Sequence, residues 1–256
     1  MSTMSKLDYA EINEYIANSV MKPFYESRIE KLSDLNLLTI LKRKNPYLFK
    51  AKNIETSGEF IKYILDAYLS SQEETMFGNL LEKLAIFICN KTYDGRKAQQ
   101  GVLKSVDLEF ERDKKYFIVG IKSGIYWGNK DQIDRMKSNF KIAKSILKKA
   151  GMKKEIIAVN GCIYGKDNKP FKENDDPQQN YYKICGQEFW ELISGDNELY
   201  KKIILPLDKE AKKRSDHFKE VYAEKSNELI KDFSDTFLTR KGSIDWEKMI
   251  DFVSKK

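Results

Sequence analysis

The strongest constraint on the fold of this chain is a hairpin pattern in residues 105–122, SVDLEFERDKKYFIVGIK. Two runs of alternating apolar and polar residues flank a turn at 112–115, and a period of two is typical of a strand. Pairing across this turn opposes three pairs of residues: Glu111 and Tyr116, Glu109 and Ile118, and Asp107 and Gly120. The pattern therefore predicts two antiparallel strands with one apolar face and one face that carries acids and a lysine.

Lys122 lies on the acidic face of this hairpin, diagonal to Asp107. Diagonal neighbours on a sheet are roughly 7–8 Å apart, which long side chains can span. The acidic face therefore presents Asp107, Glu109 and Lys122 around a gap at Gly120. A register slip of one residue would keep the alternation and change these partners.

The other predicted elements place a mixed sheet between helices. Asn129, with Gln132 three residues later, has the form of a helix cap, and a helix is expected over 129–150. Strands follow at 155–164 and 181–185, and a helical crossover between strands favours parallel pairing. Further helices are expected at 8–22, 24–42, 57–70, 73–90 and near 206–238. The predicted class is an α/β fold, a mixed central sheet flanked by helices with N- and C-terminal helical extensions.

Glu82 lies on the predicted helix at 73–90, which is apolar nearly all round. Its own side of that helix holds Gly78, Ile86 and Cys89. Carboxylates are rarely buried unless they meet a cation or a hydrogen-bond donor. Glu82 is therefore a candidate site residue, and the alternative is a helix-edge glutamate paired with a nearby lysine.

The composition excludes several kinds of catalytic chemistry. One histidine, His217, and three cysteines without a CxxC pair cannot supply a zinc site or a Ser-His-Asp triad. The formal net charge of +7 suits a polyanionic partner, although a low-GC coding bias would also enrich lysine. The absence of long apolar runs predicts a chain without a membrane span, and the three separate cysteines predict a reducing, cytoplasmic setting.

An acid on one strand, a lysine on the next and a glutamate on the preceding helix suit metal-assisted phosphodiester hydrolysis. Carboxylates hold Mg²⁺, which prefers oxygen ligands, and a lysine can orient or deprotonate the attacking water. The roles expected are metal ligands for Asp107 and Glu82, an auxiliary acid for Glu109, and a place beside the attacking water for Lys122.

These residues resemble the PD-(D/E)xK nuclease superfamily, whose core is a mixed sheet flanked by helices. Asp107 matches the first acid of that motif and Lys122 matches its lysine. Gly120, two residues before the lysine, departs from the usual Asp or Glu. The departure leaves four sources of metal ligands: Glu82, Glu109, the backbone carbonyl of Ile121 and water.

A closer resemblance, to PmeII-type type II restriction endonucleases, covers four segments. They are KNPYLFKAKNIET (44–56), LDAYLSSQEETMFGNLLEKLAIFI (65–88), VDLEF (106–110) and IKSGIYWGNKDQI (121–133). That family commonly has a small, non-acidic residue before the Ile-Lys pair, as Gly120 is here. The resemblance implies Mg²⁺-dependent cutting of double-stranded DNA by a homodimer at a near-palindromic site, with a cognate DNA methyltransferase as functional partner. The regions expected are N-terminal helices at 1–72, a nuclease core at 73–195 and C-terminal helices at 196–256.

The loop at 123–129 begins directly after the lysine strand, and its glycines permit close approach of a backbone. The candidates for base contacts are Trp127, Asn129 and Gln132, since Asn and Gln suit adenine edges. The alternative is that Tyr126 and Trp127 pack under the loop. The candidates for phosphate contacts are Lys50, Lys52 and Asn53, although exposed lysines are usually only solvated.

Two other interpretations stay open. The first is a DNA-binding protein on a catalytically decayed nuclease fold, which Gly120 makes credible. The second is a helical interaction scaffold whose hairpin acids are only solvated.

Overall fold

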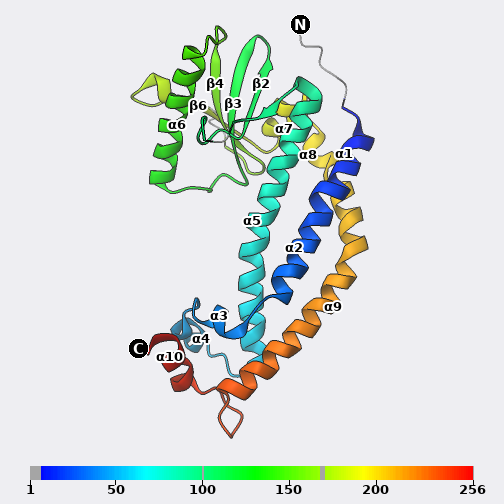
Figure 1. Cartoon of the computed structure of the whole chain (residues 1–256), viewed down its shortest axis with the longest axis vertical. Coiled ribbons are helices and arrows are strands. Elements are labelled where there is room, and N and C mark those ends of the chain that lie inside the picture. Colours follow the sequence, from blue (N-terminus) through cyan, green and yellow to red (C-terminus); the bar gives the residue numbers. More distant parts are fainter. Residues whose placement is uncertain (1–6, 100, 168–170, 256) are drawn as a thin grey trace. The chain divides into compact units, whose positions relative to one another are not determined.

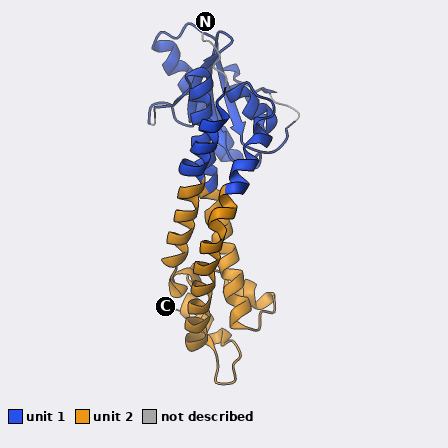
Figure 2. Ribbon diagram, turned by 90° about the vertical axis from the view of Figure 1, so that its right-hand side faces the viewer, with its two compact units in different colours: residues 1–20, 77–209 blue, residues 21–76, 210–256 orange. Residues whose placement is uncertain are grey.

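The computed structural model describes residues 7–99, 101–167 and 171–255, and Figure 1 shows the course of the chain. The chain divides into two compact units, each made from two separate segments (Figure 2). Unit 1 comprises residues 1–20 and 77–209, and unit 2 comprises residues 21–76 and 210–256. Two long helices, α5 (Ser57–Tyr93) and α9 (Ile204–Phe237), contribute residues to both units.

Within the described part of unit 1, six strands form one sheet in the order β1-β2-β3-β4-β6-β5. The strands are β1 (Arg96–Lys97), β2 (Leu108–Arg112), β3 (Lys115–Lys122), β4 (Ile156–Cys162), β5 (Phe171–Lys172) and β6 (Tyr181–Cys185). Strands β3, β4 and β6 are parallel, and the other neighbours are antiparallel. The expected α/β fold with a mixed central sheet is confirmed.

The hairpin has the predicted register. Glu109 faces Ile118 and Glu111 faces Tyr116. The two turn residues, Asp113 and Lys114, have φ angles of 52° and 62°. Positive φ at both central positions is the geometry of the type I′ turn, whose twist suits a two-residue hairpin.

Helices cover both faces of the sheet, so the acidic face of the hairpin is not a solvent face. Tyr116 and Ile118, which lie on that face, are buried against Met136 and Phe140 of α6 (Lys130–Lys149). On the other face, Phe189 of α7 (Gln187–Ser194) packs on β4, and Tyr93 of α5 stacks with Phe110 of β2. The polar side chains of this face are therefore those of Asp107, Glu109, Glu111 and Lys122, and Asp107 and Lys122 lie together near the carboxyl end of β3.

The expectation of two helices at 57–70 and 73–90 is wrong, because α5 is continuous. The residues between them, Ser71 and Gln72, include no glycine or proline that would stop a helix. Pro23 likewise does not interrupt the N-terminal helices, since it lies in the first turn of α2, where a missing N–H costs little. The remaining elements are α1 (Tyr9–Tyr15), a π-helix (Ile16–Met21), α2 (Lys22–Ser33), α3 (Leu37–Leu41), α4 (Pro46–Ala51), a 3₁₀ turn (Pro177–Gln179), α8 (Leu199–Lys202) and α10 (Trp246–Ser254).

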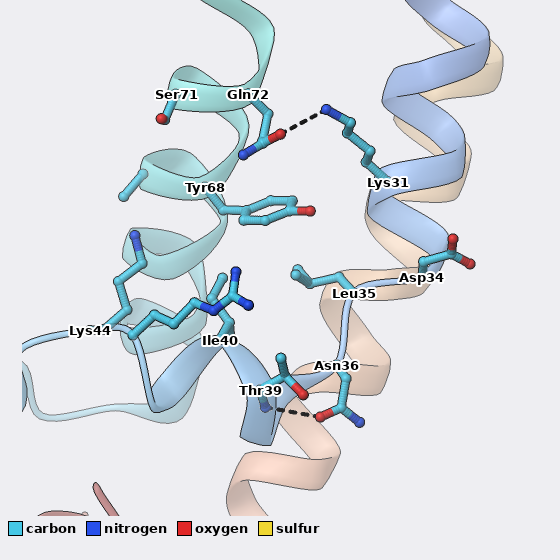
Figure 3. Close-up of a pocket in the computed structure, with 12 residues that line it drawn as sticks. Lys31, Asp34, Leu35, Asn36, Thr39, Ile40, Lys44, Tyr68, Ser71 and Gln72 are labelled. Carbon is cyan, nitrogen blue, oxygen red and sulfur yellow. Dashed lines mark hydrogen bonds between the residues drawn. The ribbon is translucent and has the colours of Figure 1, made fainter. Parts of the chain in front are cut away.

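Unit 2 is helical. Phe60 of α5 stacks on Phe233 of α9 with ring centroids 4.5 Å apart. A cavity of about 400 Å³ lies in this unit between α2, α3 and α5. Figure 3 shows the residues that line it. Lys31 donates to Gln72 across it at 2.7 Å. No helix among the described residues is long and apolar enough to cross a membrane.

Candidate active site

Asp107 lies just before β2, and two hydrogen bonds hold it to β3. Its N–H donates to the carbonyl oxygen of Val119 at 2.8 Å. Its Oδ2 accepts from the N–H of Ile121 at 2.7 Å. A backbone donor of β3 thus fixes the orientation of the carboxylate.

Lys122 ends β3 beside this carboxylate. Its Nζ donates to the carbonyl oxygen of Ile121 at 2.8 Å and lies 3.6 Å from Oδ2 of Asp107. The ammonium also lies 5.5 Å from the ring centroid of Trp127. The structure therefore brings the predicted Asp107 and Lys122 together with the backbone oxygen of Ile121, at the carboxyl end of β3.

Glu82 approaches the same place from α5. Its pKa is raised, first by burial and then by the negative charge of Asp107, while the positive charges of Lys97 and Lys122 oppose the rise. The helix can come close because residue 78, one turn earlier, is glycine. A Cβ atom at Gly78 would lie 2.4 Å from Oγ of Ser123. The carboxylate of Glu82 therefore lies within electrostatic range of Asp107 and Lys122.

The backbone that faces residue 120 explains why this residue is glycine. A Cβ atom at this position would lie 2.6 Å from the carbonyl oxygen of Ser105. Ser105 has a φ of 59°, and its Oγ accepts from the side chain of Asn139 in α6 at 2.7 Å. A carboxylate cannot be placed at residue 120 without moving this segment.

Glu109 is engaged elsewhere. Its side chain is buried, with Oε1 accepting from Nε of Arg96 at 2.8 Å and Oε2 accepting from the hydroxyl of Tyr116 at 2.9 Å. Burial and the bond to Glu109 raise the pKa of Tyr116. No hydrogen bond or ion pair in the described chain joins Glu109 to Asp107 or Lys122. Sequence reasoning missed Arg96, since its two-residue strand is too short to show a period.

The donor set suits a hard cation. No three His, Cys, Asp or Glu side chains of the described residues gather at one point. Asp107, Glu82 and the carbonyl oxygen of Ile121 are the available oxygen donors. The ammonium of Lys122 already lies against two of these oxygens, so the site attracts positive charge, and Mg²⁺ prefers oxygen ligands.

In the loop that follows Lys122, some polar groups of the candidate base-contacting residues form hydrogen bonds within the protein. Asn129 and Gln132 form a capping box in which each side-chain amide oxygen accepts from the other residue's N–H at 3.0 Å. Within the described chain their amide nitrogens donate no hydrogen bond. Trp127 packs against the core beneath α6. Tyr126 does not pack under the loop, because it is 95% exposed.

The candidate phosphate contacts lie in unit 2. The ammonium groups of Lys50 and Lys52 lie over aromatic rings, 5.3 Å from the centroid of Trp246 and 4.6 Å from that of Tyr63. Asn53 donates to Glu55 at 3.3 Å. The group at Lys122 belongs to unit 1, so the contact of these three residues with DNA stays a prediction.

A model of the type II restriction endonuclease EcoO109I family matches residues 10–215, which include the whole sheet and every candidate site residue. The chain belongs to this family. Type II restriction endonucleases are site-specific deoxyribonucleases of restriction-modification systems, act on double-stranded DNA and generally use divalent metal ions. A comparison with curated protein sequences finds no match.

This membership confirms the predicted enzyme class and DNA substrate of the endonuclease. The family that matches is the EcoO109I family, so the closer resemblance to PmeII-type enzymes stays a prediction. The roles of individual residues also stay predictions.

Proposed function

We propose that this endonuclease hydrolyses phosphodiester bonds of double-stranded DNA at a short near-palindromic site, with Mg²⁺ held at the carboxyl end of β3. The observation that carries the proposal is the contact of Lys122 with both Asp107 and the carbonyl of Ile121, at 3.6 and 2.8 Å. Glu82, whose pKa responds to both Asp107 and Lys122, completes the group. The two proposed carboxylate ligands and the motif lysine are thus assigned to one place in the described chain, the carboxyl end of β3.

Asp107, Glu82 and the carbonyl oxygen of Ile121 are the groups that would hold the ion. An ion bound there would supply a water molecule of lowered pKa and would offset charge on the leaving oxygen. The hydrogen bond from the N–H of Ile121 holds the carboxylate of Asp107 in its orientation. Burial raises the pKa of Glu82 and so disfavours its ionised form. A cation nearby favours the ionised form.

Lys122 lies beside the attacking water and acts as a hydrogen-bond donor at the reacting centre. Its ammonium can hydrogen-bond the attacking water or a phosphate oxygen, and such preorganised donors stabilise developing negative charge. Glu109 has a supporting role in this proposal. Its bonds to Arg96 and Tyr116 tie β1, β2 and β3 together below Asp107.

We further propose that the enzyme is a homodimer, because a two-fold symmetric protein matches a near-palindromic target. A cognate DNA methyltransferase is the functional partner that protects the host site. The nuclease core is assigned to residues 73–195, with helical regions at 1–72 and 196–256. Kinship with PmeII-type enzymes is supported by the segments 44–56, 65–88, 106–110 and 121–133.

The test is to incubate the purified full chain with unmethylated plasmid and phage DNA, with and without Mg²⁺. Discrete fragments that need Mg²⁺ are expected, and the sequences of their ends define the site. Tight DNA binding without cutting, across several divalent metals, would overturn the proposal in favour of a decayed nuclease. A continuous smear of products would refute the site specificity.

A further inference from the structure

The loop at 123–129 is anchored firmly to the sheet. The carbonyl of Ser123 accepts from the N–H of Tyr164 at 3.0 Å, and the carbonyl of Ile125 accepts from Nζ of Lys183 at 3.1 Å. Ile125 also packs closely on Gly165. A Cβ atom at Gly165 would lie 2.6 Å from the Cγ2 methyl group of Ile125. The far end of the loop is the capped start of α6. The loop is therefore held on both sides.

Tyr126 is the exception within this anchored loop. Its neighbours Ile125 and Trp127 are half-buried, whereas Tyr126 is 95% exposed. In the described chain its ring has no aromatic partner and its hydroxyl has no hydrogen bond. An isolated exposed aromatic side chain is ordinary on a protein surface. Tyr126, however, lies four residues after Lys122, on an anchored loop whose backbone holds its side chain in solvent.

The neighbouring loop carries a second exposed tyrosine, which contacts the 123–129 loop at Gly124. Tyr164 follows β4, is 63% exposed, and rests with its ring on the backbone of Gly124. A Cβ atom at Gly124 would lie 2.6 Å from that ring. Strands β3 and β4 are parallel neighbours, so both loops leave the same edge of the sheet as Lys122 (Figure 1). We call Tyr126 and Tyr164 the tyrosine pair.

We propose that the tyrosine pair is a subsite for DNA beside the cut phosphate, in which the ring of Tyr126 contacts a base of the substrate. This inference rests on the proposed endonuclease function. Aromatic rings bind bases through their faces, which in a duplex requires the ring to wedge into a base step, and this contact gives affinity without hydrogen bonds. The surroundings suit a polyanion, because Lys166, two residues after Tyr164, is exposed and has no carboxylate partner among the described residues. A rigid backbone also spares the entropy of ordering the loop on binding.

The test starts from duplexes that carry the site mapped with the wild-type enzyme. Their affinity is measured by fluorescence anisotropy with Ca²⁺ in place of Mg²⁺, and cleavage is then measured under single-turnover conditions with Mg²⁺. Tyr126→Ala is expected to weaken binding roughly 10-fold or more, as loss of one stacked base does. Tyr126→Phe is expected to stay within about twofold, because the ring is kept. Tyr47→Ala is the matched control, since Tyr47 is 61% exposed on α4 of unit 2.

A second readout locates the contact. Duplexes with 2-aminopurine at single positions around the cut are expected to change fluorescence on binding wild type and Tyr126→Phe, but not Tyr126→Ala. If Tyr126→Ala binds and cuts like wild type, the subsite is wrong and the endonuclease function stands. If Tyr126→Phe is as weak as Tyr126→Ala, the ring contact is wrong. If Tyr126→Ala changes the sedimenting mass instead, the residue joins two copies of the chain. Failure of the wild type itself to bind or cut DNA would refute the proposed function.

Discussion

The carbonyl oxygen of Ser105 lies 2.6 Å from the point that a Cβ atom would occupy at Gly120. Carbon and oxygen atoms do not approach so closely without displacement, and the obstacle here is backbone. The glycine in the motif is therefore required by the neighbouring segment, whose position Asn139 fixes through a 2.7 Å hydrogen bond. An acid at this position would disturb the site that it is expected to complete.

Replacing Gly120 tests this relationship. Gly120→Asp restores the superfamily pattern, yet it is expected to lower the free energy of unfolding by about 1–3 kcal/mol, as overpacking does. Cleavage should fall as well. Gly58→Ala is the control, because a Cβ atom there meets only Ile230, at 4.0 Å. Thermal unfolding and cleavage rates are compared, and a Gly120→Asp enzyme as stable as wild type that cuts faster would contradict the explanation.

Lys122 is expected to act in the chemical step more than in binding. Lys122→Met should reduce the single-turnover cleavage rate about 100-fold or more, since it removes a preorganised donor. DNA affinity should change only a few-fold. Lys137→Met, which removes a lysine paired with Asp134 on α6, is the matched control and should cut normally. Cleavage by Lys122→Met at near wild-type rate would exclude the role.

Glu109 is expected to stabilise the fold. Glu109→Ala leaves the buried hydroxyl of Tyr116 without its acceptor, which costs about 1–3 kcal/mol. Arg96 adds less, because its side chain is 70% exposed and regains water. Glu111→Ala, on the same strand with a surface partner in Lys154, should cost less than about 1 kcal/mol. Urea unfolding measures both variants.

A second substitution of Glu109 distinguishes a supporting role of this residue from a catalytic one. Glu109→Gln keeps most of the volume of the side chain, so a folded variant that has lost cleavage would identify Glu109 as the auxiliary acid. A folded variant that still cuts would identify it as a supporting residue.

The three cysteines are expected to be unreactive in the native enzyme. All are buried, and burial raises the pKa of Cys162 to about 12 and that of Cys89 and Cys185 above the ordinary value. Only the thiolate reacts, so a raised pKa leaves almost none of it at pH 8. A thiol reagent such as DTNB should therefore label no cysteine in the native chain and all three in guanidinium chloride. Rapid labelling of the native chain at pH 8 would contradict this.

The sequence determines the hairpin well, because a two-residue turn at Asp113 and Lys114 sets the register and the alternation sets the faces. It also locates α6, since the Asn129 cap is local chemistry. Tertiary contacts were not predictable in the same way. The burial of the acidic face under Phe140, the partnership of Glu109 with Arg96, and the backbone of Ser105 at Gly120 all join segments that are distant in sequence.

The exposure of Tyr126 is a further case. Adjacent aromatic residues such as Tyr126 and Trp127 give the same apolar signal in sequence. Only the path of the loop decides that one ring packs and the other faces solvent.

The most direct test of the site compares wild type with Asp107→Asn on a mapped duplex, with cleavage and DNA affinity measured in parallel. Wild type should cut with Mg²⁺ and not with EDTA. Asp107→Asn should cut about a thousandfold more slowly or not at all, because the loss of a metal ligand removes several kcal/mol of transition-state stabilisation. Its DNA affinity should stay within a few-fold of wild type. Cutting by Asp107→Asn at the wild-type rate, or by wild type in EDTA, would contradict a metal centre at Asp107.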